Sequence, residues 1–211
     1  CIRDSIHGGL YHSQSIDSYF FNIPGIRVAF PSNASDAKGL LKSSLRMDDP
    51  VIFLEHKGLY RQGYAATPEP DKDYVLPFGK ANLIEEGDIL TIVTWGAMVQ
   101  KSIDAIKLCN LEKSDVDLID LRTLNPIDWA AIHNSVEKTG KLLIVHEDLL
   151  TGGVGAEIAA KISDELFEEL DGPIKRVAAK DCHVPYHDLL EKQVLPQTEQ
   201  IVEAVNDLME Y

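Results

Sequence analysis

The feature that most constrains the fold is a regular alternation of apolar and amphipathic segments through residues 88–210. In chain order the segments are "DILTIVTW", "GAMVQKSIDAIKLC", "DVDLIDLRTL", "DWAAIHNSVEKTG", "KLLIVHED", "GGVGAEIAAKISDELFEEL", "IKRVAAK" and "QTEQIVEAVNDLME". The short runs are apolar almost throughout, which is typical of strands buried on both faces. The longer segments have the spacing of amphipathic helices. This half therefore predicts a three-layer α/β/α domain with a mostly parallel sheet.

The first half contains a shorter unit of the same kind, in which "GIRVAFP", "SNASDAKGLLKSSLRMDD" and "PVIFLEH" predict a strand, a helix and a strand. We expect Ser32 or Ser35 to cap the helix, because a hydroxyl can accept a hydrogen bond from the first free backbone amides. The expected buried face of this helix consists of Ala37, Leu40, Leu41 and Leu45.

The two halves are separated by "YAATPEPDKDYVLP", which has three prolines among charged residues and no clear period. Such a composition indicates a connection that runs over the surface. We therefore expect one domain over residues 1–63, a linker over 64–77 and a second domain over 78–211.

Composition narrows the classes of function. The net charge of −14 argues against nucleic acid and anionic membranes as partners, since both select basic surfaces. Cys1, Cys109 and Cys182 are widely spaced and odd in number, so neither a disulfide framework nor a zinc site is expected. The chain begins on Cys1 rather than Met, and we expect it to be part of a longer polypeptide.

In open parallel sheets, ligands bind beyond the carboxyl ends of the strands. Polar residues follow the predicted strands at Trp95-Gly96, Arg122-Thr123, His146-Glu147-Asp148 and Thr151-Gly152-Gly153. The phrase "TGGVGAE" opens a helix and could hold an anion, but it lacks both the GxGxxG spacing and a lysine. Glycines that allow close chain contact are the preferred interpretation there. For His146 and Glu147, local hydrogen bonding or a subunit contact is preferred over catalysis.

His12 lies in "GGLYHSQS", where two glycines allow a close approach of the backbone. Tyr11, Ser13 and Gln14 surround the imidazole with groups that can fix its tautomer. The spacing alone leaves two interpretations open, a positioned acid/base and a structural loop histidine. No Gly-x-Ser-x-Gly elbow accompanies the serine, which argues against a serine hydrolase.

Several phrases in order resemble the β subunit of thiamine-diphosphate-dependent 2-oxo acid dehydrogenases, of branched-chain or pyruvate type, within the transketolase-like superfamily. They are "HGGLYHSQS", "IPGIRVAFPSNASDAKGLLKSSLRMDDPVIFLEHKGLYR", "LRTLNPID" and "HEDLLTGGVGAEIAA". The resemblance implies that residues 1–63 end a pyrimidine-binding domain and that residues 78–211 form a transketolase C-terminal domain. It also implies oxidative decarboxylation of a 2-oxo acid with acyl transfer to lipoamide. A ring-activating glutamate would lie upstream of Cys1, so the fragment alone is expected to be inactive.

The resemblance also implies roles for particular residues. His12 would be the catalytic acid/base facing the thiazolium side of thiamine diphosphate, with Tyr11 and His12 beside the cofactor and Ser13 and Gln14 as orienters. The positions that match a structural potassium site in this family are Ser44, Leu45, Met47 and Asp49. The diphosphate and its Mg²⁺ would be held by the α subunit.

Partners implied by the resemblance are an α subunit or the α half of a fused chain, a second β subunit, and the docking and lipoyl domains of a dihydrolipoyl acyltransferase. Docking is expected near "KDCHVPYHDLLEKQVLP", which holds His183, Tyr186 and His187, and on acidic residues such as Glu191, Glu199 and Glu203. The location would be cytoplasmic in a bacterium and the mitochondrial matrix or a plastid in a eukaryote. One alternative is a non-catalytic module for dimerisation and acyltransferase docking. The other is a different transketolase-like enzyme, and the phrase "YHSQS" argues against this second alternative.

Overall fold

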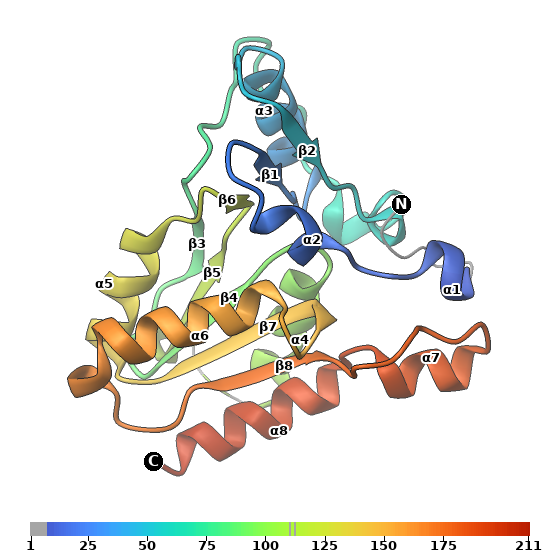
Figure 1. Ribbon diagram of the computed structural model, residues 1–211. Helices are drawn as coiled ribbons and strands as arrows, with labels where there is room; N and C mark the ends of the chain where they lie inside the picture. Colours follow the sequence, from blue (N-terminus) through green and yellow to red (C-terminus); the bar gives the residue numbers. More distant parts are fainter. Residues whose placement is uncertain (1–7, 110, 112) are drawn as a thin grey trace.

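A computed structural model describes residues 8–109, 111 and 113–211 and arranges them around two sheets (Figure 1). The larger sheet has the strand order β3-β5-β4-β7-β8. Its strands β5, β4, β7 and β8 are parallel, and β3 pairs antiparallel with β5 at one edge. The bounds are β3 Asn82–Glu85, β4 Leu90–Thr94, β5 Val116–Asp120, β7 Leu142–Leu149 and β8 Lys175–Ala179.

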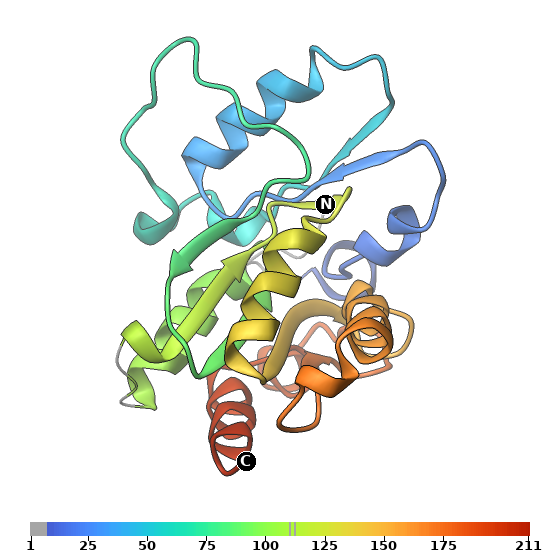
Figure 2. The ribbon, with the colours of Figure 1, turned by 90° about the vertical axis from the view of Figure 1, so that its left-hand side faces the viewer.

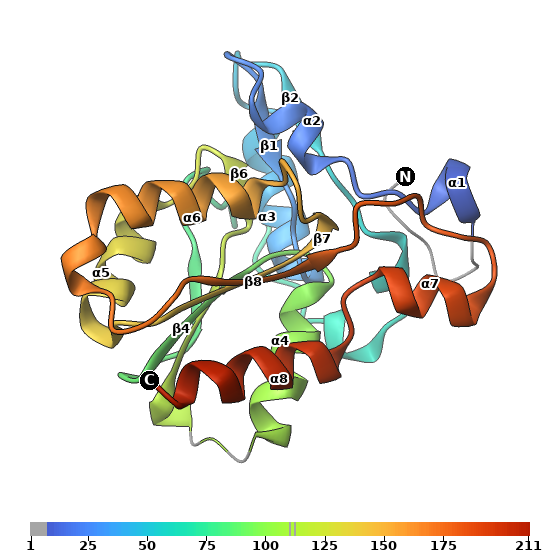
Figure 3. The ribbon, with the colours of Figure 1, turned by 60° about the horizontal axis from the view of Figure 1, so that its bottom comes forward.

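Helices cover both faces of this sheet, as the alternating pattern predicted. Figure 3 shows α6 and α8 on opposite sides of β7 and β8. Helices α5 (Trp129–Thr139) and α6 (Val154–Glu165) pack on one face, and α4 (Met98–Leu108) and α8 (Thr198–Met209) pack on the other. The three-layer α/β/α prediction is confirmed.

The ends of α5 show why this segment is helical. The side chain of Asp128 accepts a hydrogen bond from the backbone N–H of Ala131 and so caps the amino end of the helix. At the other end, Gly140 takes a left-handed conformation with φ of 68°, which is easiest for a residue without a Cβ. The helix therefore begins and ends where its sequence provides the caps.

The smaller sheet joins the two halves of the chain. Its order is β2-β1-β6, with β1 (Arg27–Ala29) parallel to β2 (Val51–Phe53) and antiparallel to β6 (Thr123–Asn125). The run "DVDLIDLRTL", expected as one strand, is therefore two strands in different sheets. The break lies at Arg122, which has φ of 60° and turns the chain out of the larger sheet.

The predicted helix between β1 and β2 is α3 (Ala34–Ser44), but its cap differs from the expectation. Asn33 is the N-cap, and its side-chain oxygen accepts from the backbone N–H of Asp36 at 3.0 Å. Ser32 and Ser35 do not cap the helix, because their hydroxyls bond to residues far along the chain.

The buried face expected for α3 is only partly correct. Leu40 is 1% exposed, whereas Leu41 is 45% exposed and Leu45, at the C-cap, is 80% exposed. The part of α3 that points away from the sheets is thus more apolar than a solvated helix face usually is.

Residues 64–77 run beside α3 (Figure 2). The ammonium of Lys38 donates to the carbonyl of Pro70 at 2.9 Å, and the backbone N–H of Leu76 donates to the carbonyl of Gly39 at 3.2 Å. A Cβ on Gly39 would lie 2.8 Å from Cγ of Leu76, so this close approach requires glycine. The segment follows the surface of the first half, and the division of the chain into domains stays a prediction.

Short helices complete the fold. The shorter α-helices are α1 Gly9–His12, α2 Asp17–Phe21 and α7 Asp188–Val194, and the 3₁₀ turns are η1 Lys57–Leu59, η2 Gly63–Ala65, η3 Lys113–Asp115 and η4 Phe167–Glu169. Within the described residues, no helix combines the length and the apolar character needed to cross a membrane.

Candidate functional site

His12 is the last residue of α1, and its side chain is exposed. Tyr11 beside it is 88% exposed. The next two residues point the other way: the hydroxyl of Ser13 and the amide nitrogen of Gln14 are buried and have no hydrogen-bond partner among the described residues. The two residues predicted to contact a cofactor are therefore accessible, and two unused polar groups lie next to them in the chain.

We call residues 9–18 the His12 segment, and both of its ends contact the second half of the chain. At the first end, Gly9 lies against Tyr186, so that a Cβ on Gly9 would be 3.4 Å from Cβ of Tyr186. In Figures 1 and 3, α1 lies beside the connection from β8 to α7. At the other end, the backbone N–H and the hydroxyl of Ser18 donate to Oδ2 of Asp148 at 3.1 and 2.6 Å.

A buried pair of carboxyl groups lies at that second end. Asp17 is fully buried, and Asp148 at the end of β7 is nearly so. Asp17 accepts from the indole N–H of Trp95 at 2.9 Å and from the hydroxyl of Ser15 at 3.1 Å, and it is also hydrogen-bonded to Asp148. Burial, and next the charge of Asp148, raise the pKa of Asp17 well above its usual value. Burial therefore favours the neutral, protonated form of Asp17.

His146 packs beside this pair without bonding to it. Its ring stacks on Trp95 with centroids 5.3 Å apart and planes 5° apart. Burial lowers the pKa of His146 to about 4, so the ring is neutral at physiological pH. Neither ring nitrogen has a hydrogen-bond partner in the described part of the chain. A Cβ on Gly155 would lie 2.6 Å from the ring, which supports the interpretation of "TGGVGAE" as glycines that allow close packing.

Glu147 lies between these two residues on β7, and its side chain makes a different contact. Alternate residues of a strand point to opposite faces, so Glu147 points away from His146 and Asp148. Both carboxylate oxygens of Glu147 lie 3.2 Å from Nε2 of His56, and both side chains are almost fully buried. The carboxyl end of β7 thus contacts the first half of the chain through both of its faces.

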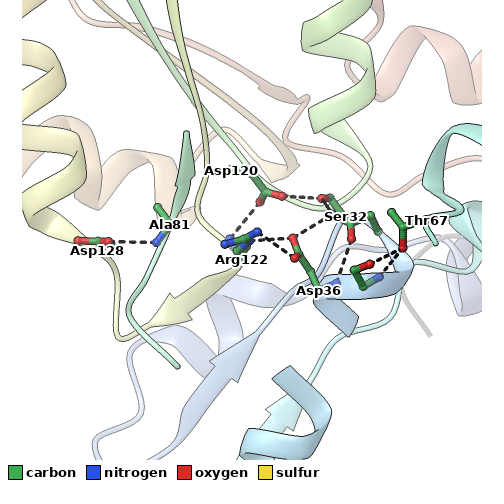
Figure 4. Close-up of polar contacts among 9 residues, drawn as sticks. Ser32, Asp36, Thr67, Ala81, Asp120, Arg122 and Asp128 are labelled. Atoms are coloured by element: carbon green, nitrogen blue, oxygen red, sulfur yellow. Dashed lines mark hydrogen bonds and ion pairs between the residues drawn. The ribbon is translucent and has the colours of Figure 1, made fainter. Parts of the chain in front are cut away.

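A second buried carboxyl, Asp120, lies at the end of β5 (Figure 4). The hydroxyl of Ser32 donates to its Oδ2 at 2.5 Å, and the backbone N–H of Arg122 donates to its Oδ1 at 3.0 Å. Arg122 in turn forms a two-pronged ion pair with Asp36, with N···O distances of 2.7 and 2.9 Å. Burial is the main cause that raises the pKa of Asp120 to about 7.

A cavity of about 280 Å³ opens beside this cluster, at the carboxyl ends of β1 and β2. Ser32 and Asn33 line it on the β1 side, and His56 and Tyr60 line it on the β2 side. This is the position at which open parallel sheets accept ligands. Its lining is mainly apolar with a few polar groups, as in many small-molecule sites.

The positions predicted for potassium lie at the carboxyl end of α3. The hydroxyl of Ser44 donates to the carbonyl of Leu40 at 2.8 Å, and the carboxylate of Asp49 accepts from Arg27 Nε at 2.8 Å. Ser44, Leu45, Met47 and Asp49 remain a predicted potassium site, because carbonyl ligation leaves little trace in side-chain contacts. No group of three or more His, Cys, Asp or Glu side chains able to hold a metal occurs in the described part.

The sequence alone did not identify several residues at these sites. Asp17 follows His12 by five positions, but nothing in its local pattern distinguishes it from a helix-opening acid. Asp117 and Asp120 interrupt the apolar residues of β5, which was an available signal for buried carboxyls. His56 was read only as the end of a strand, and its pairing with Glu147 joins positions that are 91 residues apart.

Comparisons with known proteins agree with the arrangement of the fold. Residues 2–62 match the model of the transketolase pyrimidine binding domain, and residues 79–201 match the transketolase C-terminal domain. A solved structure described as a split gene transketolase, inactive beta4 tetramer, aligns with a TM-score of 0.76 and 23% identity, covering 94% of this chain and 62% of that one. At this identity, the structural match supports the fold alone.

Curated relatives align over almost the whole chain. The 2-oxoisovalerate dehydrogenase subunit beta of Bacillus subtilis is 41% identical over 207 residues, which is 98% of this chain and 63% of the relative. The pyruvate dehydrogenase E1 component subunit beta of Staphylococcus aureus strain Mu50 is 40% identical over 100% of this chain and 65% of its own length. A mitochondrial 2-oxoisovalerate dehydrogenase subunit beta 2 of Arabidopsis thaliana is 42% identical over 97% and 56%. The chain thus spans less than two thirds of these relatives, and it belongs to the transketolase family, with pyrimidine-binding and C-terminal domain sequences in one polypeptide.

Proposed function

We propose that this chain is part of the β subunit of a thiamine-diphosphate-dependent 2-oxo acid dehydrogenase, which decarboxylates a 2-oxo acid and passes the acyl group to lipoamide. The observation that carries the proposal is the identity of about 40%, over essentially the whole chain, to β subunits of pyruvate and 2-oxoisovalerate dehydrogenases. Relatives of both kinds are similar to the same extent, so the proposal covers pyruvate and branched-chain 2-oxo acids.

His12 is the acid/base of the proposed reaction. Its imidazole is exposed at the end of α1, so that a substrate held by the assembled enzyme can reach it. An imidazole takes up and releases protons near neutral pH, and positioned proton transfer typically contributes about 10²–10⁴-fold to a rate. Both ends of the His12 segment are attached to the second half, which limits where the imidazole can be.

The residues around His12 fit a cofactor with a polar ring. The buried hydroxyl of Ser13 and amide nitrogen of Gln14 lack partners in the described part, and Tyr11 offers an exposed aromatic face. When bound, thiamine diphosphate supplies the electron sink that decarboxylation of a 2-oxo acid requires. In this proposal Tyr11 and His12 contact the cofactor, the α subunit holds the diphosphate with Mg²⁺, and the carboxyl end of α3 holds potassium.

The proposed partners are the α subunit, a second β subunit, and the docking and lipoyl domains of an acyltransferase. His183, Tyr186 and His187 are exposed between β8 and α7, which suits a docking surface. Glu199 and Glu203 are exposed, but Glu191 is 1% exposed and does not belong to an accessible acidic surface. The expectation for Glu191 was wrong, because α7 turns it toward the protein.

The test is the replacement His12→Ala in the full-length β subunit assembled with its α partner. Decarboxylation of pyruvate and of 3-methyl-2-oxobutanoate is measured with an artificial electron acceptor and, separately, with the lipoyl domain. We expect turnover to the lipoyl domain to fall by about 10²–10⁴-fold while cofactor binding stays near normal. The isolated chain without the α partner is expected to be inactive.

His133→Ala on α5 is the matched control, because it removes a half-buried imidazole that pairs with Glu165 and lies in no site described above, and it should leave turnover near that of the unmodified enzyme. Turnover of His12→Ala within a few fold of the control would reduce His12 to a structural loop histidine. An unmodified assembly that acts on neither 2-oxo acid would contradict the proposed function itself.

A further inference from the structure

We propose that Asp17 and Asp148 form a proton-sharing clasp that positions His12, which makes both of them positioning residues for the reaction. The inference rests on the proposed function for its catalytic consequence, whereas the clasp itself is a property of the contacts in this chain. It concerns the end of the His12 segment that lies against β7.

The clasp is completed by several donors that converge on two buried carboxyl groups. Oδ2 of Asp148 accepts both the backbone N–H and the hydroxyl of Ser18, and its Oδ1 accepts the backbone N–H of Leu149 at 2.8 Å. Three donors fix the position of the Asp148 carboxyl, and the two from Ser18 attach the His12 segment to β7. Burial, and next the charge of Asp148, raise the pKa of Asp17, which favours the proton on Asp17.

The surroundings of Asp17 act in both directions. The indole N–H of Trp95 donates to Oδ2 of Asp17 and lowers its pKa, but burial and the neighbouring Asp148 raise that pKa by more. His146 stacks on Trp95 and is neutral, because burial lowers its pKa to about 4 despite the opposing charge of Asp148, and the charge of Arg176 adds to the effect of burial. Asp148 is thus the charged group that acts on Asp17.

The link to His12 is short. Residues 13–16 alone separate His12 from Asp17, and Ser13 among them is fully buried. At the other end of the segment, Gly9 lies against Tyr186. With both ends held by the second half of the chain, an opening of the clasp would release the segment on one side of the imidazole. Misplacement of a catalytic group by about 1 Å can reduce a rate by about 10²-fold.

The two carboxyls of the clasp are far apart in the sequence, and neither belongs to the phrase "YHSQS" that contains His12. Asp17 lies two residues beyond "YHSQS", and Asp148 is the last residue of "HED" near the carboxyl end of β7. Ser18 and Asp148 are 130 residues apart, so the contact depends on the fold that places the carboxyl end of β7 beside α2.

The experiment compares Asp17→Ala, Asp17→Asn and Asp164→Asn in the full-length β subunit assembled with its α partner. Alanine removes the proton and the acceptor for Trp95. Asparagine keeps the shape, accepts from the indole with its oxygen, donates to Asp148 with its amide and cannot ionise. Asp164 is an exposed carboxyl on α6 and serves as the matched control.

The first measurement is amide hydrogen exchange at Ser18, which does not depend on activity. In Asp17→Ala we expect this amide to exchange at least about tenfold faster, because local opening of the segment becomes easier. In Asp17→Asn and in the control it should exchange as in the unmodified chain. Unchanged exchange at Ser18 in Asp17→Ala would overturn the clasp, whatever the enzyme does.

The second measurement is steady-state kinetics with a 2-oxo acid and the lipoyl domain. Asp17→Ala should lower kcat by about ten- to a hundredfold with KM changed less than about threefold, since the proton donor and not the substrate site is displaced. Asp17→Asn should restore kcat at neutral pH. A loss of stability in Asp17→Ala with kcat unchanged would assign the pair a structural role only and would overturn the positioning role.

The third measurement is the pH dependence of amide exchange at Ser18 and of kcat. Because the pKa of Asp17 is raised in the folded chain, the clasp is intact below that pKa and is lost as pH rises through it, when two carboxylates face each other. After correction for the intrinsic base catalysis of amide exchange, exchange at Ser18 should therefore accelerate, and kcat should fall, as pH rises through the raised pKa of Asp17 in the unmodified enzyme and not in Asp17→Asn. Identical corrected pH profiles for the two proteins would overturn proton sharing. Inactivity of the unmodified assembly would contradict the proposed function and leave the exchange data to decide on the clasp.

Discussion

Asp17 and Asp120 are both fully buried carboxyls that connect residues 1–63 to the second half of the chain, yet their surroundings differ in one respect. Asp120 lies next to Arg122, which carries a positive charge and is itself paired with Asp36. Asp17 lies next to Asp148 and Trp95, and no cation contributes to its pKa. One junction therefore contains a charge cluster, and the other contains a shared proton.

The consequence is a difference in how each carboxyl responds to pH. Burial raises the pKa of both groups. At Asp120 the hydrogen bond from Ser32 is the main opposing effect, the charge of Asp36 adds to burial and the charge of Arg122 lowers the pKa least, and the resulting pKa is about 7. At Asp17 the charge of Asp148 adds to the effect of burial and outweighs the hydrogen bond from Trp95. The hydrogen bond from Ser32 thus leaves Asp120 close to titration at neutral pH, whereas the neighbouring carboxyl of Asp148 favours the protonated form of Asp17.

The largest effect is expected from the loss of the cation. Arg122→Met leaves Asp36, which is almost fully buried, without its partner, and breaking a buried ion pair in this way costs about 3–5 kcal/mol. The free energy of unfolding, measured by urea denaturation, should fall by that amount. Arg27→Met is the control, because its pair with Asp49 is exposed and is worth less than about 1 kcal/mol. Equal losses in the two variants would contradict the role given to Arg122.

A smaller effect is expected from Asp120→Asn, and it depends on pH. The folded chain holds a proton on Asp120 up to about pH 7, whereas the unfolded chain releases it near its ordinary pKa of 3.8. The stabilising contribution is therefore complete below pH 3.8 and is lost as pH rises to about 7, with a slope of up to about 1.4 kcal/mol per pH unit. Unfolding at pH 4.5, 6 and 7.5 should show the unmodified chain losing about 2–4 kcal/mol relative to Asp120→Asn. A constant difference across this range would show that Asp120 does not titrate there.

The sequence was sufficient to predict the helix and sheet layers of the second half, because the spacing of apolar residues within each segment indicates whether it forms a strand or a helix. Strands buried on both faces and the helices between them follow from apolar spacing alone, and α8 (Thr198–Met209) appears where "QTEQIVEAVNDLME" predicted a helix. The break at Arg122 was not predictable in this way, since it arises from pairing between β6 and β1. The cap of α3 was wrong for a similar reason, because distant partners occupy the hydroxyls of Ser32 and Ser35.

The candidate site was predictable only in part. The phrase "YHSQS" drew attention to His12, and the structure places that side chain at the surface on a segment held at both ends. The carboxyls that hold the His12 segment were not predictable, because their role depends on burial and on a partner that is 130 residues away in the chain. Local pattern indicates which residue types are unusual, whereas the pKa of a buried acid depends on the whole fold.

The smallest effect is expected from removing the serine hydroxyl that donates to each of the two buried carboxyls. Ser32 donates to Asp120 at 2.5 Å in a buried site, and Ser15 donates to Asp17 at 3.1 Å in a partly buried one. At pH 8 Asp120, with a pKa of about 7, is ionised, whereas burial and the charge of Asp148 raise the pKa of Asp17 well above its usual value and favour its neutral form. A hydrogen bond to a charged group is the stronger of the two. Ser32→Ala should therefore lower the free energy of unfolding by about 1.5 kcal/mol at pH 8, and Ser15→Ala by about 0.5 kcal/mol. At pH 5 both acceptors are neutral, and the two losses should converge. A difference that persists at pH 5 would show that burial of the serine, and not the charge on its acceptor, distinguishes the two sites.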